Sequence, residues 1–219
     1  MTKKNENMTP DDYRDSLLDA IMTHVAFDGW SDKAMKQAAE DIGIDPGIVD
    51  LAFPDGAMGM LDLCAQRCDL AMLEIIKDAE FHDQKIREKI TALVRARIEI
   101  ETPHKEAANR AAPFVALPQN HYRALKILYR TVDLMWKAIG DQSTDFNYYT
   151  KRMTLSAVYS STFLYWLNDE SEDHQQTWEF LDRRIENVMQ FEKFKFQNKD
   201  KLPDLAKVWR KLGEKRYGS

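Results

Sequence analysis

The sequence is poor in the residues on which several classes of protein depend. Its 219 residues include only 8 Gly and 7 Pro, which is too few turn formers for an all-β chain. The two cysteines, Cys64 and Cys68, lie four residues apart in a segment with helical periodicity. They therefore indicate no disulfide framework and fit a reducing compartment. We expect two small buried thiols, since a metal pair would need further ligands and no histidine lies nearby.

Long apolar runs and targeting signals are also missing. The longest charge-free run, Met153–Asn168, has 16 residues, fewer than the roughly 20 needed to span a bilayer. We expect it to form a helix buried inside the protein. Residues 1–12 have no apolar core and contain acidic residues but no Arg, which argues against a signal or transit peptide.

No motif of a known catalytic chemistry is present. The sequence contains no Gly-rich phosphate loop, no Gly-x-Ser-x-Gly and no His-Glu-x-x-His. A four-helix di-iron site needs two Glu-x-x-His pairs, and the one such spacing, Glu101 to His104, contains the helix breaker Pro103. We therefore expect no enzyme, no metal site and no cofactor, although a site assembled from distant residues stays possible.

Apolar residues recur at helical spacing along most of the chain, which predicts an all-α bundle. The first unit, residues 9–55, has a helix between the cap Thr9 and the stop Gly29 and then two short helices, with Ala34, Ala38 and Ile42 facing inward. The body, residues 56–190, should contain helices at 56–79, 84–101, 104–116, 118–140, 146–167 and 174–190.

The last segment, residues 191–219, differs in charge from the body. Residues 190–219 carry nine Lys or Arg and four acidic residues, in a chain whose net charge is −5. A basic amphipathic helix with a Trp on its apolar side suits an anionic membrane surface. Such a helix could equally dock on the body. The expected membrane-contact residues are Leu205, Val208, Trp209 and Leu212.

The first unit has the layout of a helix-turn-helix but the wrong charge for binding DNA. Residues 1–62 contain five basic and thirteen acidic residues. The helix that would read the bases, residues 45–53, has two acidic residues and no basic or amide side chain. Because phosphate contacts supply much of the affinity for DNA, we expect no nucleic-acid partner.

Two stretches resemble one family specifically. They are Gly-Asp-Gln-Ser-Thr-Asp-Phe-Asn-Tyr-Tyr-Thr-Lys-Arg at 140–152 and Thr-Trp-Glu-Phe-Leu-Asp-Arg-Arg-Ile-Glu-Asn-Val-Met at 177–189. Both are similar to the lipid-binding accessory proteins of ubiquinone biosynthesis, over about residues 115–190. The resemblance is looser over 10–62, where Gly29-Trp30 and the turn at 53–56 are similar to the TetR regulator layout.

This resemblance implies a TetR-like helical bundle with a degenerate helix-turn-helix and a C-terminal amphipathic helix. It implies a homodimer that holds an isoprenoid, quinone precursor or phospholipid in a cavity. The protein would present that lipid to a membrane-associated di-iron enzyme, the demethoxyubiquinone hydroxylase. The implied location is cytoplasmic and peripheral on the inner membrane face, as in bacteria, or the mitochondrial matrix side if a transit peptide is missing here.

The resemblance also suggests site residues. The partner surface of the family falls on Tyr148 and Tyr149, of which one ring should be exposed because neighbours at a helix start cannot both face inward. Both rings could instead pack on nearby loops. The candidates for lining the lipid cavity, which could equally be plain core, are Leu128, Val132, Met135, Leu155, Val158, Tyr159, Thr162 and Trp166.

Two other functions stay open. The helix-turn-helix layout also fits a TetR-like, ligand-responsive transcriptional regulator. An enzyme acting on a quinone precursor is the third possibility.

Overall fold

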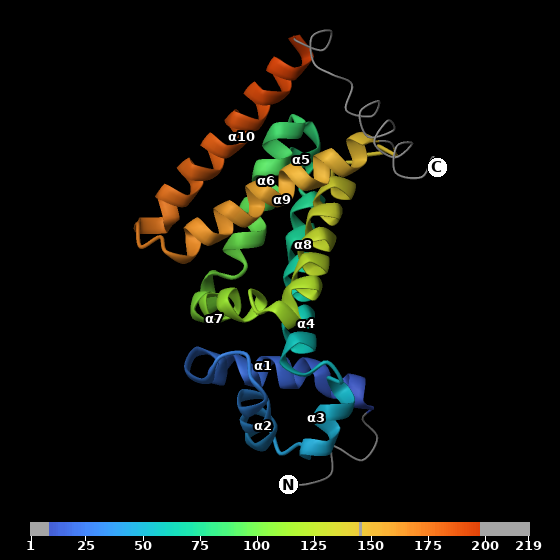
Figure 1. Ribbon diagram of the computed structural model, residues 1–219, viewed down its shortest axis with the longest axis vertical. Coiled ribbons are helices and arrows are strands. Elements are labelled where there is room, and N and C mark those ends of the chain that lie inside the picture. Colours follow the sequence, from blue (N-terminus) through green and yellow to red (C-terminus); the bar gives the residue numbers. More distant parts are fainter. Residues whose placement is uncertain (1–8, 145, 198–219) are drawn as a thin grey trace, which may run out of the picture.

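The computed structural model describes residues 9–144 and 146–197, and all of the regular structure in these ranges is helical (Figure 1). This confirms the predicted all-α class. The α-helices are α1 Pro10–Asp28, α2 Asp32–Asp41, α3 Pro46–Ala52, α4 Gly56–Met72, α5 Ala79–Asp83, α6 Ile86–Glu99, α7 Lys105–Val115, α8 Pro118–Ala138, α9 Phe146–Leu167 and α10 Gln175–Gln197. The predicted membrane-contact residues Leu205, Val208, Trp209 and Leu212 lie outside the described residues.

The N-terminal unit of α1, α2 and α3 has its own core. Thr9 and Asp12 form a reciprocal capping box at the start of α1, and the Ser31 side chain accepts a hydrogen bond from the backbone of Ala34 at the start of α2. At the end of α1, Gly29 adopts a positive φ of 65°, which stops the helix at the predicted residue. The core of the unit is built from Leu17, Ile21, Val25, Ala34, Ala38 and Val49.

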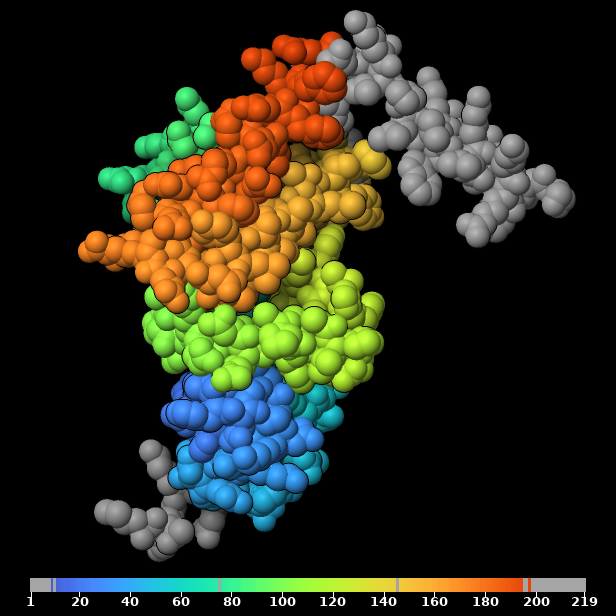
Figure 2. All heavy atoms as spheres, turned by 60° about the vertical axis from the view of Figure 1, so that its left-hand side comes forward, coloured from blue at the N-terminus to red at the C-terminus, as the bar shows by residue number. Residues whose placement is uncertain are grey.

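A second core lies in the body. It joins α6, α8, α9 and α10 through the side chains of Leu93, Val132, Met135, Leu155, Trp166 and Leu181. Helix α7 lies between the two cores, and Figure 2 shows the N-terminal unit, the α7 region and the α9–α10 layer as successive tiers. The Trp30 indole donates a hydrogen bond to the Ala107 carbonyl at 3.0 Å and so ties the first unit to α7.

Two predicted helix ends are wrong. The helix expected over 56–79 ends at Met72, where a 3₁₀ turn, Leu73–Lys77, follows. The Asp78 side chain then accepts a hydrogen bond from the Glu80 backbone and caps α5, so a new helix starts inside the range assigned to the old one. The helix expected to end near residue 190 continues to Gln197, because a change in charge does not by itself stop a helix.

Two predictions of burial are also wrong. The run Met153–Asn168 is buried on one face of α9 only, since Leu155, Val158 and Trp166 are buried whereas Met153 and Leu164 are exposed. Its serine and threonine hydroxyls donate to carbonyls one turn back, as Ser160 does to Ser156 at 2.6 Å, so a charge-free helix can face solvent. Ile42 is 37% exposed because it ends α2 at a turn rather than facing the core.

Cys68 is buried and Cys64 partly so, in line with two structural thiols. No helix in the described part of the chain is long and apolar enough to cross a membrane.

Candidate functional site

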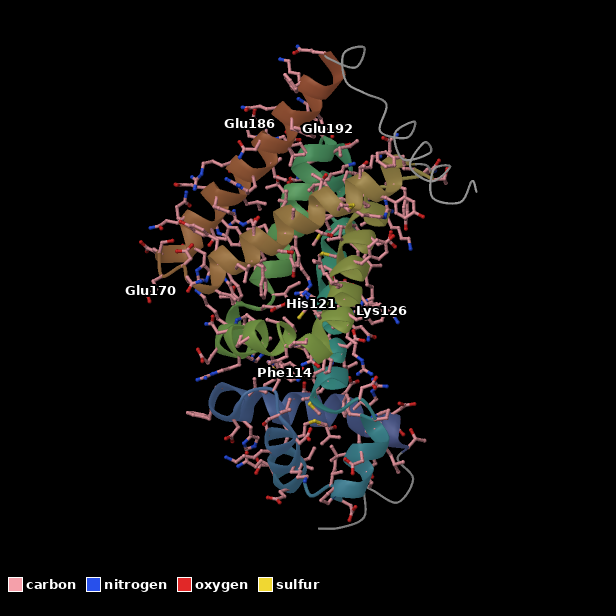
Figure 3. The ribbon with its side chains drawn as sticks, viewed as in Figure 1. Phe114, His121, Lys126, Glu170, Glu186 and Glu192 are labelled. Carbon is pink, nitrogen blue, oxygen red and sulfur yellow. The ribbon has the colours of Figure 1, made fainter. Side chains whose placement is uncertain are left out.

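A pocket of about 460 Å³ opens between the two cores, within the size range of small-molecule sites. Five helices supply its walls: Leu61 and Ala65 come from α4, Arg97 from α6, and further residues from α7, α8 and α9. Figure 3 shows His121 on the side of α8 that faces α7, whereas Lys126 points away from that side. The accessible surface inside the pocket is mostly apolar. This composition suits a ligand with a hydrocarbon part.

The pocket changes character from its deep end to its mouth. The buried lining residues are Ala65, Arg97, Thr131 and Tyr159. The exposed lining residues are Ala116, His121, Leu125 and Leu164. Most of the polar groups therefore lie at the deep end, and the two leucines border the opening.

A buried ionic cluster forms the floor of the deep end. Asp69 accepts hydrogen bonds from Arg97 Nε at 2.9 Å and from the Thr131 hydroxyl at 2.8 Å. Arg97 also pairs through Nη1 with Glu101, and Arg130 Nε donates to the second oxygen of Asp69 at 3.3 Å. Burying charges is costly unless they are paired, and here each charge has an opposite partner.

The structure places the eight predicted lipid-lining residues in two groups. Leu128 and Tyr159 line the pocket. The other six are packed into the body and are not pocket-lining: Val132, Met135, Leu155, Val158, Thr162 and Trp166. Helical spacing identified the inward face of α8 and α9 but could not separate wall from core. Binding by any of the eight stays a prediction.

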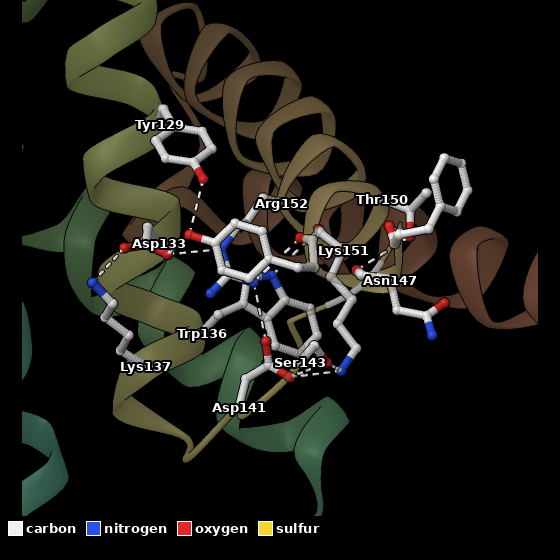
Figure 4. Close-up of polar contacts among 12 residues, drawn as sticks. Tyr129, Asp133, Trp136, Lys137, Asp141, Ser143, Asn147, Thr150, Lys151 and Arg152 are labelled. Carbon is white, nitrogen blue, oxygen red and sulfur yellow. Dashed lines mark hydrogen bonds and ion pairs between the residues drawn. The ribbon is translucent and has the colours of Figure 1, made fainter. Parts of the chain in front are cut away.

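A second cluster organises the motif at 140–152 (Figure 4). Arg152 is 2% exposed and is held by Asp133 at 2.7 Å and by Asp141 at 3.0 Å. Lys151 donates to Asp141 at 2.6 Å and to Ser143 at 2.7 Å. Burial alone would raise the pKa of Asp141, but the hydrogen bonds from Lys151, Ser143 and Arg152 outweigh it and hold the pKa well below its usual value.

The same cluster positions the two predicted partner-binding tyrosines. The Tyr148 hydroxyl donates to Asp133 at 3.1 Å and accepts from the Tyr129 hydroxyl at 3.0 Å. Tyr149 packs edge-on against Tyr148 and is 60% exposed, so one of the two rings is exposed, as expected. The exposed ring is thus carried by an anchored one, which suits an interface residue.

Sequence reasoning missed both charge clusters. Arg97, Asp69 and Arg152 are buried although each is charged, and the Asp133 side chain is only 13% exposed. A signal was present for Arg97, which lies four residues after Leu93 in a stripe that is otherwise apolar. No group of three or more His, Cys, Asp or Glu residues in the described ranges could hold a metal ion.

Comparison with known proteins identifies relatives over most of the chain. A family model described as COQ9 matches residues 122–192. This range contains the α8 residues of both charge clusters and the α9 residues of the second cluster. A ubiquinone biosynthesis protein COQ9, mitochondrial, of Drosophila melanogaster is 33% identical over 83% of this chain and 57% of its own length. The protein of the same name from Homo sapiens is 30% identical over 79% of this chain and 56% of its own length. The chain thus spans just over half the length of these relatives.

A solved structure shows the fold. The TetR transcriptional regulator from Nitrosomonas europaea ATCC 19718 superposes with a TM-score of 0.65 and 22% identity, covering 80% of this chain and 97% of the regulator. The predicted TetR-like fold is therefore confirmed, although at this identity the likeness concerns fold alone. Together, the family match and the relatives show that this chain is similar to the COQ9 proteins over most of its length.

Proposed function

We propose that this chain is a lipid-binding accessory protein of ubiquinone biosynthesis that performs no catalytic step itself. The observation that carries the proposal is the apolar pocket between α4, α6, α7, α8 and α9. The names of the COQ9 relatives supply the pathway. The ligand would be an isoprenoid, a quinone precursor or a phospholipid, bound by Leu128 and Tyr159 together with the other pocket walls.

The bound lipid would be presented to the demethoxyubiquinone hydroxylase. The exposed Tyr149, held by the anchored Tyr148, is the contact we assign to this partner. Adjacent exposed side chains on α9, Phe146 and Met153, extend an apolar surface beside it. Large exposed aromatic and apolar side chains supply much of the energy of protein interfaces.

We also propose a homodimer and a peripheral membrane location. Exposed apolar side chains on α9 and α10, such as Leu164, Met189 and Phe191, support an association of copies. The basic, apolar-striped segment that includes Trp209 supports contact with an anionic lipid surface. That location would bring the pocket close to its lipids, on the cytoplasmic or matrix side of the membrane.

The alternative function, a TetR-like transcriptional regulator, has only the fold in its favour. Helix α3 carries Asp50 and no basic side chain, and Asp45 caps it. A positively charged surface is the first requirement for binding DNA. A DNA mobility shift at physiological salt would restore the regulator hypothesis, and we expect none.

Filling the pocket tests the proposal. Ala112 lines the pocket on α7, so Ala112→Phe should occupy the space of the ligand, while Ala157→Phe adds the same ring at an exposed position on α9. We expect Ala112→Phe to lose uptake of decylbenzoquinone, measured by native mass spectrometry, and Ala157→Phe to keep it. Equal uptake by both variants, with both folded by circular dichroism, would place the lipid elsewhere and overturn the assignment.

A further inference from the structure

Both cysteines line a second, smaller cavity, which lies between α1, α4 and α7 and has a volume of about 60 Å³. Cys68 is buried and Cys64 is partly exposed, and Met22 of α1 lines the same cavity. His104 also lines it and is exposed, so the cavity lies close to the surface. A space of this size suits an ion or a few water molecules rather than an organic ligand.

The spacing of the two thiols favours a bridging ion over a disulfide. Cys64 and Cys68 lie one helical turn apart on α4. Side chains at this spacing have their Cβ atoms about 5–6 Å apart, whereas a disulfide needs about 3.8 Å. A disulfide would therefore distort α4. An ion between the two sulfurs adds a bond of about 2.3 Å on each side, and so spans the distance without moving the helix.

The surroundings of Cys68 favour its thiolate form. The hydrogen bond with Cys64 lowers the pKa of Cys68, burial opposes this effect, and the Arg97 guanidinium lowers the pKa further. The thiolate is the form that binds metal ions. The cavity therefore brings together a thiolate, a second thiol and a nearby positive charge that offsets part of the negative charge of the site.

The donor atoms indicate a soft, monovalent ion. No group of three or more His, Cys, Asp or Glu in the described ranges could hold a metal, so Glu101 and His104 do not complete a tetrahedral zinc site with the thiols. An iron–sulfur cluster needs four protein ligands, and the chain has two cysteines. Thiolate and thioether ligands suit Cu(I), and Met22 is the third sulfur-bearing residue at the cavity.

We propose that Cys64 and Cys68 bind one Cu(I) ion as a two-thiolate site on α4, with the Met22 thioether as a third, weaker ligand. The site is separate from the proposed lipid pocket, although Leu61 and Ala65 line both cavities. The lipid-binding function proposed above uses neither thiol, so the two proposals stand or fall independently.

Anaerobic titration of the full chain with Cu(I), in competition with the chelator bicinchoninate, tests this site. We expect one Cu(I) per chain and an ultraviolet thiolate-to-copper charge-transfer band. Loss of an outer-shell partner alone weakens metal binding about 10- to 100-fold, so Cys64→Ser and Cys68→Ser should each cost more than about a hundredfold and abolish the band. Met22→Leu should cost about tenfold. Met35→Leu is the matched control, because this buried methionine lies outside the cavity, and it should leave binding unchanged.

The wild-type protein gives a second measurement that does not depend on the folding of the cysteine variants. One equivalent of Cu(I) should slow the alkylation of Cys64 by iodoacetamide, measured by peptide mass spectrometry. Four results would overturn the proposal: no Cu(I) binding by the wild type, undiminished binding by both serine variants, Zn(II) binding as tight as that of Cu(I), or alkylation that Cu(I) does not slow.

Discussion

The guanidinium carbon of Arg152 lies 3.4 Å from the centre of the Tyr148 ring, while the same guanidinium binds Asp133 and Asp141. One buried cation thus fixes an aromatic ring, the end of α8 and the loop before α9. Cations stacked on aromatic faces are stabilised by the ring quadrupole. The family motif at 140–152 can be understood as the chain segment that builds this arrangement and displays Tyr149.

Removing Arg152 should therefore destabilise the fold. Arg152→Ala leaves two largely buried carboxylates, Asp133 and Asp141, without their shared partner. We expect a loss of about 3 kcal/mol in the free energy of unfolding, measured by urea denaturation. Arg184→Ala, at an exposed arginine on α10, is the control and should cost far less. Equal losses in the two variants would show that the cluster contributes nothing specific.

Tyr149 should affect partner binding but not stability. Its ring is exposed, so Tyr149→Ala removes little buried area. We therefore expect the free energy of unfolding to change by less than about 0.5 kcal/mol. Binding to the purified demethoxyubiquinone hydroxylase should weaken about tenfold or more, measured by biolayer interferometry. Phe27→Ala, which removes an exposed ring from α1, should leave binding unchanged. If Phe27→Ala were the more damaging change, the interface would lie on the N-terminal unit instead.

Asp169 should make stability depend on pH. Burial alone would raise its pKa, but hydrogen bonds from Ser171 and Thr177 lower it well below the usual value. A depressed pKa contributes stability that is present above the unfolded value of about 4 and is lost as the pH falls below it. Asp169→Asn, which cannot ionise, should be about 2 kcal/mol less stable at pH 7, and the gap should narrow towards pH 3 in urea titrations. A gap that is independent of pH would refute an ionised Asp169 cap.

A substitution of Trp30 should show how much the contact between the N-terminal unit and the body contributes to stability. Trp30→Phe removes the hydrogen bond to the Ala107 carbonyl and part of a buried ring. We expect the free energy of unfolding, measured by thermal denaturation, to fall by about 1 to 2 kcal/mol. Met35→Leu, a buried exchange of similar volume inside the N-terminal unit, should cost less. A larger loss for Met35→Leu would mean that packing within the unit, not this contact, limits stability.

Helical periodicity was sufficient to predict most of the fold. The caps Thr9 and Ser31 and the stop Gly29 lie where simple capping rules place them. The break after Met72 was missed because apolar residues continue at helical spacing through Ile76, although Asp78 caps the new helix through a local hydrogen bond from Glu80. Periodicity also treats every inward residue alike, so it assigned exposed Ile42 to a core.

The candidate site was only partly predictable, for a related reason. A stripe such as Leu128, Val132 and Met135 shows which face of α8 is inward, but a pocket depends on where facing helices fail to fill space. Buried Arg97 and Asp69 come from α6 and α4 and meet only in the folded chain. Their pairing has no local pattern in the sequence.

Native mass spectrometry of gently purified protein, before and after organic extraction, tests the central claim most directly. The account predicts an additional mass on the native protein that is removed by extraction and identified in the extract as an isoprenoid, a quinone precursor or a phospholipid. Protein that carries no lipid and takes up none when it is offered would contradict the account. The pocket between α4, α6, α7, α8 and α9 would then have no role as a lipid site.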